Sequence, residues 1–317
     1  MRLLRAICVR IGVAIATLFA VSSLLFFGTE VLPGDAATAL LGRDATPELL
    51  ALTRHRVGLD RPVLERYGDW LTGVVTGDFG VSLASGFPVW DFVGPRLVNT
   101  LALAALTLLV LIPVSFLFGA LSAVLRDRYF DHVTSTVTLV LMAVPEFVVG
   151  TFLAIGLGVW TSLLPPVSII DPEQSIFSQL SLLMLPMLTL LAAAFAQMIR
   201  MVRSALIDVL HSDCVEMARF KGVPEWRVVA VHALPNTLAA TVQIVAFNAA
   251  YLIGGVVIVE TVFQYAGIGE GIVLSVGSRD APTVLALGLV ITGAYVLINL
   301  VADLIVIALN PRLREAR

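Results

Sequence analysis

Ionisable and amide side chains lie within several long apolar stretches of the sequence, where such a group is costly and usually faces a cavity or a polar partner. For Gln197, Asn299 and Asp303 we favour hydrogen bonding between helices. The four candidates for lining a cavity or pathway are Glu146, Gln243, Asn248 and Glu260. Glu146 follows Pro145, which has no N–H and leaves a helix carbonyl free, so it is the better candidate for lining a translocation pathway. The alternative for all four is hydrogen bonding between helices.

The residues needed for ATP hydrolysis or metal catalysis are missing from the sequence. A P-loop needs Gly-Lys-Ser/Thr, because the lysine must reach the phosphates and the hydroxyl must reach Mg²⁺. The single lysine, Lys221, lies between Phe220 and Gly222. The motifs HExxH and GxSxG are absent, and the two cysteines, Cys8 and Cys214, have no metal-ligand spacing. We therefore expect no catalytic residue, no metal site and no cofactor in this chain.

The composition indicates that most of the chain lies in a membrane. Of the 317 residues, 58% are hydrophobic and 14% are charged, whereas soluble domains have about 45–50% apolar and about 25% charged residues. A net charge of −3 without a dense basic tract argues against nucleic-acid binding. Six apolar runs are long enough to cross a bilayer. They are residues 10–32, 98–125, 132–163, 180–206, 237–263 and 283–309. The predicted fold class is an all-α polytopic membrane protein with six transmembrane helices.

The basic residues predict the orientation of these helices. Thirteen of the 20 lysines and arginines lie near the two chain ends, between the second and third predicted helices, or between the fourth and fifth. Six of the others lie in residues 33–96, a segment long enough to be translocated largely regardless of its charge. The positive-inside rule then places both termini in the cytoplasm and residues 33–96 outside.

This topology divides the chain into four parts. They are the cytoplasmic N-terminus with the first helix (1–32), an extracytoplasmic insert between the first two helices (33–96), a core of the other five helices (97–310) and a cytoplasmic tail (311–317). In the insert, Thr46-Pro47-Glu48 predicts the start of a helix, and the pattern of residues 63–75 predicts another. The insert is either a lid on the outer helix ends or a docking surface for an extracellular partner.

The longest cytoplasmic connection, residues 207–235, carries the local signals of a short helix. Asp213 and Glu216 have the spacing of a capping box, which predicts a helix start with reciprocal side-chain hydrogen bonds. Gly222 suits the left-handed conformation that ends a helix, and Pro224 suits the first turn of a second helix reaching Pro235. The first helix is either a solvated connector or a contact site for a cytoplasmic protein.

The same loop resembles the EAA signature (E-A-A-x3-G-x9-I-x-L-P) found in permease subunits of bacterial ATP-binding-cassette importers. Met217 and His232 depart from the signature, and the spacing fits throughout. The matching residues are Glu216, Ala218, Gly222, Leu234 and Pro235. The resemblance implies that the helix beginning at Asp213 is the coupling helix, which contacts the ATP-hydrolysing subunit.

Further strings are similar to the dipeptide, oligopeptide and nickel permease family, specifically to its first, B-type subunit. They are Leu32-Pro33-Gly34-Asp35, Gly58-Leu59-Asp60-Arg61-Pro62, Gly77-Asp78-Phe79-Gly80 and Val259-Glu260-Thr261-Val262-Phe263. Their order and spacing extend nearly from end to end of the chain. The resemblance implies the type I importer permease fold in the plasma (inner) membrane.

The resemblance also implies partners. These are a homologous second permease that forms a heterodimer, two cytoplasmic ATP-binding subunits or domains that use ATP and Mg²⁺, an extracytoplasmic substrate-binding protein, and membrane lipid. The implied function is ATP-driven import of di- or oligopeptides by alternating access. Alternative substrates are nickel complexes, opines and haem, and the alternative class is an ATP-independent secondary transporter.

Overall fold

The computed structural model describes residues 2–31, 46–171, 174–254 and 256–309, and it contains helices but no β-strand within these ranges. The string 32–35 and the tail 311–317 lie outside the described residues. The α-helices are α1 (Arg2–Val31), α3 (Pro47–Val57), α4 (Val63–Thr76), α5 (Val89–Val124), α6 (Tyr129–Ala143), α7 (Glu146–Leu153), α8 (Leu180–Leu210), α9 (Asp213–Phe220), α10 (Glu225–Arg227), α11 (Leu234–Asn236), α12 (Leu238–Gly254), α13 (Val257–Phe263), α14 (Ile268–Gly277) and α15 (Ala281–Leu309). Two π-helical segments, η2 (Ala154–Trp160) and η4 (Val228–Ala233), and one 3₁₀ turn, η3 (Ile176–Gln179), join them.

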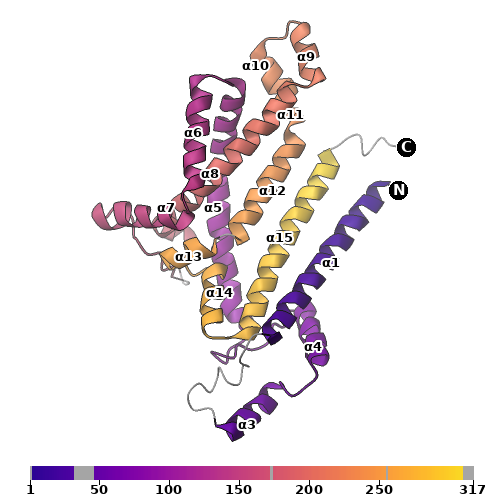
Figure 1. The fold of residues 1–317 in the computed structure, drawn as a ribbon, viewed down its shortest axis with the longest axis vertical. Coiled ribbons are helices and arrows are strands. Elements are labelled where there is room, and N and C mark those ends of the chain that lie inside the picture. Colours follow the sequence, from indigo (N-terminus) through magenta and orange to yellow (C-terminus); the bar gives the residue numbers. More distant parts are fainter. Residues whose placement is uncertain (1, 32–45, 172–173, 255, 310–317) are drawn as a thin grey trace.

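The helices α5 and α8 make the most extensive contact in the bundle and form its core (Figure 1). Leu103 and Leu111 of α5 and Met198 of α8 are fully buried there. Near the ends of the two helices, a Cβ on Gly119 would lie 2.9 Å from the carbonyl oxygen of Ile199, so only glycine allows this approach. The close packing fixes α8, which leads directly into the 207–235 loop.

Within the described residues, four helices are individually long and apolar enough to cross a membrane, namely α1, α5, α8 and α15. Three further bent pairs raise the count to as many as seven if each pair crosses once. The predicted class, an all-helical membrane protein, is therefore confirmed. The count of six transmembrane helices stays a prediction, because the described residues allow from four to seven. The helix α5 begins at Val89, inside the segment assigned to the insert, because Val89 and Val93 are buried against α14 and α15.

The runs predicted as the third and fifth transmembrane helices are broken in the structure. Between α6 and α7 the chain bends by 95° at Pro145, and Val144 before it is extended with ψ of 123°. A proline lacks the N–H that would continue the helix and disfavours helical geometry in the preceding residue. The fifth run, residues 237–263, forms α12 up to Gly254 and then the separate helix α13, which turns by 81° into α14.

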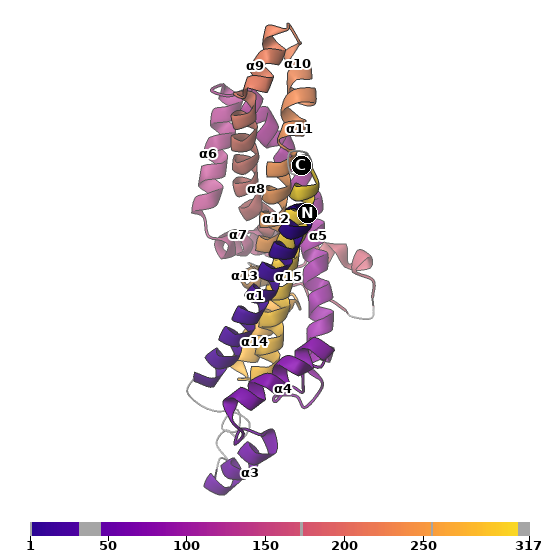
Figure 2. The same ribbon diagram turned by 90° about the vertical axis from the view of Figure 1, so that its right-hand side faces the viewer.

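The molecule is elongated, and its two ends carry different elements (Figures 1 and 2). One end, called here the α9 end, carries α9 and α10, and the start of α1 and the end of α15 lie in the same half. The opposite end, called the α4 end, carries α3 and α4. In the described part of the insert, α3 and α4 lie where the sequence predicts helices. The hydroxyls of Tyr67 on α4 and Ser23 on α1 lie 2.8 Å apart and form a hydrogen bond. This hydrogen bond attaches the insert to α1.

Candidate functional site

The short helix α9 begins at Asp213, as predicted, and forms the tip of the α9 end (Figure 1). The predicted capping box is wrong. Ser212 is the N-cap residue, Asp213 is the first helical residue, and neither forms a side-chain capping bond. The Ser212 hydroxyl instead donates to the carbonyl of Val209, 2.6 Å away in the last turn of α8. The helix start is therefore held by the preceding helix and not by Glu216.

One face of α9 packs on the ends of the long helices. Val215 and Ala218 are buried, three residues apart, in a cluster with Leu206 and Leu210 of α8 and Val228 of η4. A small residue at position 218 allows α9 to lie close to these side chains. The helix is therefore fixed to the bundle and can transmit displacement to it.

The corner after α9 has the geometry that the sequence predicted for Gly222. Its φ is 75°, in the left-handed region, and its N–H donates to the Arg219 carbonyl at 2.9 Å. Pro224 then precedes α10, and helical structure continues to Asn236. The segment η4 before Pro235 is π-helical, which is consistent with a proline that cannot donate to the carbonyl four residues earlier. Leu234 and Pro235, at the start of α11, are exposed.

Arg219 ties the two halves of the loop together. Its Nη2 lies 2.6 Å and its Nε 3.2 Å from the two carboxylate oxygens of Glu225, and its Nη1 donates to the Leu210 carbonyl at 3.3 Å. The hydrogen bond and the charge of Glu225 raise the pKa of Arg219 above its ordinary value. One side chain thus connects α9, α10 and the end of α8.

The outer face of the loop is apolar at its centre and charged at its edge. Met217, Phe220 and Trp226 have exposed fractions of 56%, 84% and 65%. Glu216 and Lys221 are exposed beside them. Glu216 makes no hydrogen bond or ion pair within the described part of the chain, and within the loop its charge acts only at a distance, on Arg219.

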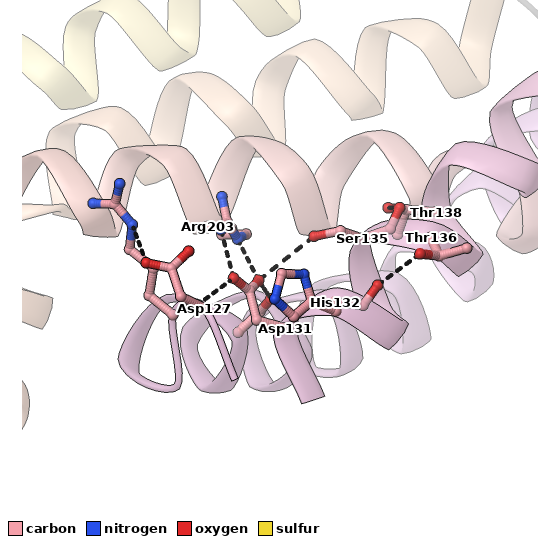
Figure 3. A network of polar contacts seen from close by, with 9 residues as sticks. Asp127, Asp131, His132, Ser135, Thr136, Thr138 and Arg203 are labelled. Atoms are coloured by element: carbon pink, nitrogen blue, oxygen red, sulfur yellow. Dashed lines mark hydrogen bonds and ion pairs between the residues drawn. The ribbon is translucent and has the colours of Figure 1, made fainter. Parts of the chain in front are cut away.

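A buried ion pair that the sequence did not reveal lies just below the loop (Figure 3). Asp131 of α6 is 2% exposed and accepts two hydrogen bonds from Arg203 of α8, at 2.6 and 2.7 Å. The hydroxyl of Ser122 and the N–H of Asp127 also donate to Asp131. The pair locks the α5–α6 turn to α8. Its partners are 72 residues apart, so no local spacing could have indicated it.

Glu260, on α13 about halfway along the molecule (Figures 1 and 2), lies in a closed network. It is fully buried and accepts from the hydroxyl of Thr100 at 2.7 Å and from the N–H groups of Gly269 and Glu270 at 2.7 and 3.2 Å. The hydroxyl of Thr100 also accepts from the N–H of Ile268 at 2.9 Å. Glu260 therefore fastens the α13–α14 turn to α5, and this network accounts for its burial.

Gln243 joins three helices near the α9 end. Its amide donates to Asp303 of α15 at 3.2 Å, and Asp303 also forms an ion pair with Arg10 of α1. Asp303 and Gln243 therefore both connect helices.

Glu146 and Asn248 are the remaining candidates for the pathway, and neither is fully hydrogen-bonded. The first residue of α7, Glu146, accepts a hydrogen bond from Tyr251 of α12 through Oε1. Its Oε2 is buried and has no donor among the described residues. Asn248 is fully buried on α12, and its Oδ1 likewise has no donor there. The four pathway candidates are not joined in one network by any hydrogen bond or ion pair of the described chain.

Comparison with known proteins agrees with the arrangement. Residues 115–315 match the family model of the binding-protein-dependent transport system inner membrane component, and residues 3–104 match the model of its N-terminal region. The glutathione transport system permease protein GsiC of Shigella flexneri serotype 5b (strain 8401) is 35% identical over 300 residues, covering 95% of each chain. GsiC of Escherichia coli (strain K12) matches with the same identity and coverage.

Proposed function

The chain belongs to the family of binding-protein-dependent transport system inner membrane components, and from this premise we propose how it operates within its transporter. A member of this family is a multi-pass inner-membrane permease subunit of an ATP-binding-cassette importer and is itself non-catalytic. The importer's ATP and Mg²⁺ are used, in our proposal, by two separate cytoplasmic ATP-binding subunits or domains.

The ATPase contact is assigned to the outer face of α9 and its corner. The observation that carries this assignment is the exposure of Met217, Phe220 and Trp226 at the tip of the molecule, while the opposite face of α9 is packed. Exposed aromatic side chains gathered at one place, with charges around them, are typical of a surface that binds another protein.

The residues shared with the EAA signature, together with Asp213, have three roles in this proposal. Ala218 and Gly222 shape the loop, since one is buried under α9 and the other forms the left-handed corner. Asp213 and Glu216 are exposed and are available for the ATPase subunit. Leu234 and Pro235 are exposed at the start of α11, where they set the path back into the membrane.

The α9 end then faces the cytoplasm, and the α4 end faces the extracytoplasmic side. The beginning of α1 and the end of α15 lie in the α9 half, which supports cytoplasmic termini (Figure 1). The arginines beside the connections at this end favour the same orientation. The described part of the insert, α3 and α4, is accordingly outside.

Coupling follows a continuous path of contacts. Closure of the ATPase subunits displaces α9, and Arg219 makes α10 and the end of α8 move with it. The Asp131–Arg203 pair passes the displacement from α8 to the α5–α6 turn. The bundle then alternates between outward and inward access. In this proposal Glu146 and Asn248 line the pathway, whereas the main role of Gln243 and Glu260 is to hold neighbouring helices together.

The substrate is a small peptide in this proposal, delivered by an extracytoplasmic binding protein to a heterodimer of this chain with a homologous second permease. The relatives at 35% identity are named as glutathione transport permeases, and glutathione is itself a small peptide. The names of these relatives are our reason for proposing a peptide as the substrate in preference to nickel complexes, opines or haem.

The proposal is tested by reconstituting the complete transporter with Phe220→Asp in this chain. Phe220 is 84% exposed, so the substitution should leave folding unchanged and abolish most ATP-driven peptide uptake and ATPase-subunit binding. The matched control is Tyr129→Asp, because Tyr129 is 85% exposed on α6 of the same half of the molecule. Normal uptake by the Phe220 variant, or uptake by the purified chain without ATPase subunits, would overturn the assignment.

A further inference from the structure

The elbow between α6 and α7 places a carboxylate in the middle of the molecule. The helix α7 leaves α6 at about half the length of the bundle (Figures 1 and 2) and packs on α8 and α13. Pro145 ends the straight path, and Glu146 is the first residue after it. The carboxylate therefore lies away from both ends of the molecule, at membrane depth in the proposed orientation.

The hydrogen bonding of Glu146 is incomplete. The Tyr251 hydroxyl donates to Oε1, whereas Oε2 is buried without a donor in the described chain. No arginine, lysine or histidine of the described residues forms an ion pair with it. A carboxylate in this setting is costly unless a hydrogen-bond donor or a positive charge compensates it.

A second acceptor without a donor lies on the helix that holds Tyr251. Asn248 precedes Tyr251 by one turn of α12, so the two side chains lie on the same face of the helix. Asn248 is fully buried, its Nδ2 donates to the Ile244 carbonyl at 2.8 Å, and its Oδ1 receives nothing. Two buried oxygens, one carrying a charge, are thus left open on α7 and α12.

Three other buried or partly buried carboxylates of the apolar helices are compensated inside the chain. Asp131 is paired with Arg203, Asp303 with Arg10, and Glu260 with one hydroxyl and two backbone N–H groups. A role in holding helices together explains these three. It does not explain Glu146, because a neutral glutamine could accept the Tyr251 hydrogen bond equally well.

We propose that Glu146 and Asn248 form a subsite of the translocation pathway for the primary ammonium group of the substrate, such as the N-terminal amine of a peptide. An ammonium group carries three N–H donors and one positive charge, which match two open acceptors and one negative charge. Tyr251 is a positioning residue that holds the carboxylate toward α12. The inference rests on the proposed function and names the substrate group that this subsite recognises.

The test uses the complete reconstituted transporter, held with ATP and vanadate after delivery of a radiolabelled dipeptide by its binding protein. In the wild type we expect glycinamide to displace the retained dipeptide and N-acetylglycinamide, which lacks the ammonium group, not to do so. In Glu146→Gln, retention should fall about tenfold and the difference between the two competitors should disappear. Glu146→Asp, which keeps the charge, should retain the difference.

The control variant is Glu48→Gln, a carboxylate-to-amide change at an exposed position of α3, which should behave as the wild type. Tyr251→Phe should weaken retention less than Glu146→Gln and keep the preference for glycinamide. Equal retention and equal displacement in Glu146→Gln and wild type would overturn the subsite. Loss of the second permease from the purified Glu146→Gln complex would also overturn it, since the carboxylate would then be an interface residue.

These outcomes are separable from a failure of the proposed function. If the transporter does not hydrolyse ATP in response to the loaded binding protein, the importer assignment fails before the subsite is tested. If ATP hydrolysis in response to the loaded binding protein is normal in Glu146→Gln, while retention of the dipeptide falls and the preference for the ammonium group disappears, the subsite is supported.

Discussion

Replacing Gly222 by valine perturbs the corner between α9 and α10 without creating a steric clash. The φ of Gly222 is 75°, and a Cβ built there meets no atom within 4 Å. The free-energy cost is therefore that of the left-handed conformation itself, about 1–2 kcal/mol for a residue with a side chain and more for a β-branched one.

This cost appears in the affinity for the ATPase subunit. In the free permease the substituted corner can relax to another conformation, in which α10 is displaced from α9. Binding must then restore the native corner, so the dissociation constant rises by the same free energy, about 5- to 30-fold. Gly222→Asn should give a smaller rise, because asparagine tolerates the left-handed region better than other non-glycine residues.

The assay is a titration of the permease heterodimer in lipid nanodiscs with the labelled ATPase subunit. Gly77→Val is the matched control, since Gly77 has φ of 85°, also meets nothing within 4 Å and lies at the opposite end of the molecule. An unchanged dissociation constant for Gly222→Val, in a correctly inserted heterodimer, would refute the reasoning. An equal loss of affinity in Gly77→Val would show that the effect is a general loss of stability.

Three other substitutions test the contacts around the sites. Asp131→Asn leaves the Arg203 guanidinium, whose side chain is 27% exposed, without its carboxylate. It should lower the stability by about 3 kcal/mol, read as a lower thermal midpoint that Arg203→Gln partly restores in the double variant. Gly267→Ala places a Cβ 2.0 Å from a Glu260 oxygen, so we expect a loss of about 1–3 kcal/mol in the same measurement. Arg219→Gln should weaken binding of the ATPase subunit a few-fold. The binding should also depend less on salt concentration, because salt screens the partly exposed ion pair of Arg219 with Glu225. Unchanged binding would contradict the role given to Arg219.

The parts of the fold that the sequence predicts are those set by local chemistry. Thr46 accepts a hydrogen bond from the N–H of Leu49 and begins α3, as a threonine before a proline indicates. Gly222 takes the left-handed conformation that its place after α9 requires. In both cases the deciding interaction lies within a few residues, so the pattern of residue types was sufficient.

The bends in the membrane helices could not be predicted in the same way. Over residues 139–163 the third predicted run is almost uniformly apolar, and such a stretch contains no periodicity to show where a helix turns. Pro145 was visible in the sequence, but prolines also lie inside the continuous helices α5 and α8. Tertiary contacts of α7 with α8 and α13 decide that this one ends the helix.

The site was predictable only where its residues are neighbours in the chain. The coupling loop follows from one stretch of sequence, although Ser212 and not Asp213 occupies the N-cap. The Asp131–Arg203 pair and the Glu146–Tyr251 hydrogen bond join residues 72 and 105 positions apart. Since either partner could have paired with many groups, only the packed structure identifies them.

Whether the chain itself supplies hydrogen-bond donors or positive charge to a carboxylate in the apolar helices indicates whether that carboxylate has a structural or a functional role. Asp303 and Glu260 receive donors or positive charge from the chain itself, so their amide variants should change stability more than substrate handling. Glu146 is partly buried and its Oε2 receives no donor from the described chain, so we assign the missing donor to a group that enters from outside it. In an importer the group that arrives at this depth is the substrate, and it must also leave. A single carboxylate with one neutral acceptor suits that requirement, because it favours an ammonium group without enclosing it in a full set of partners.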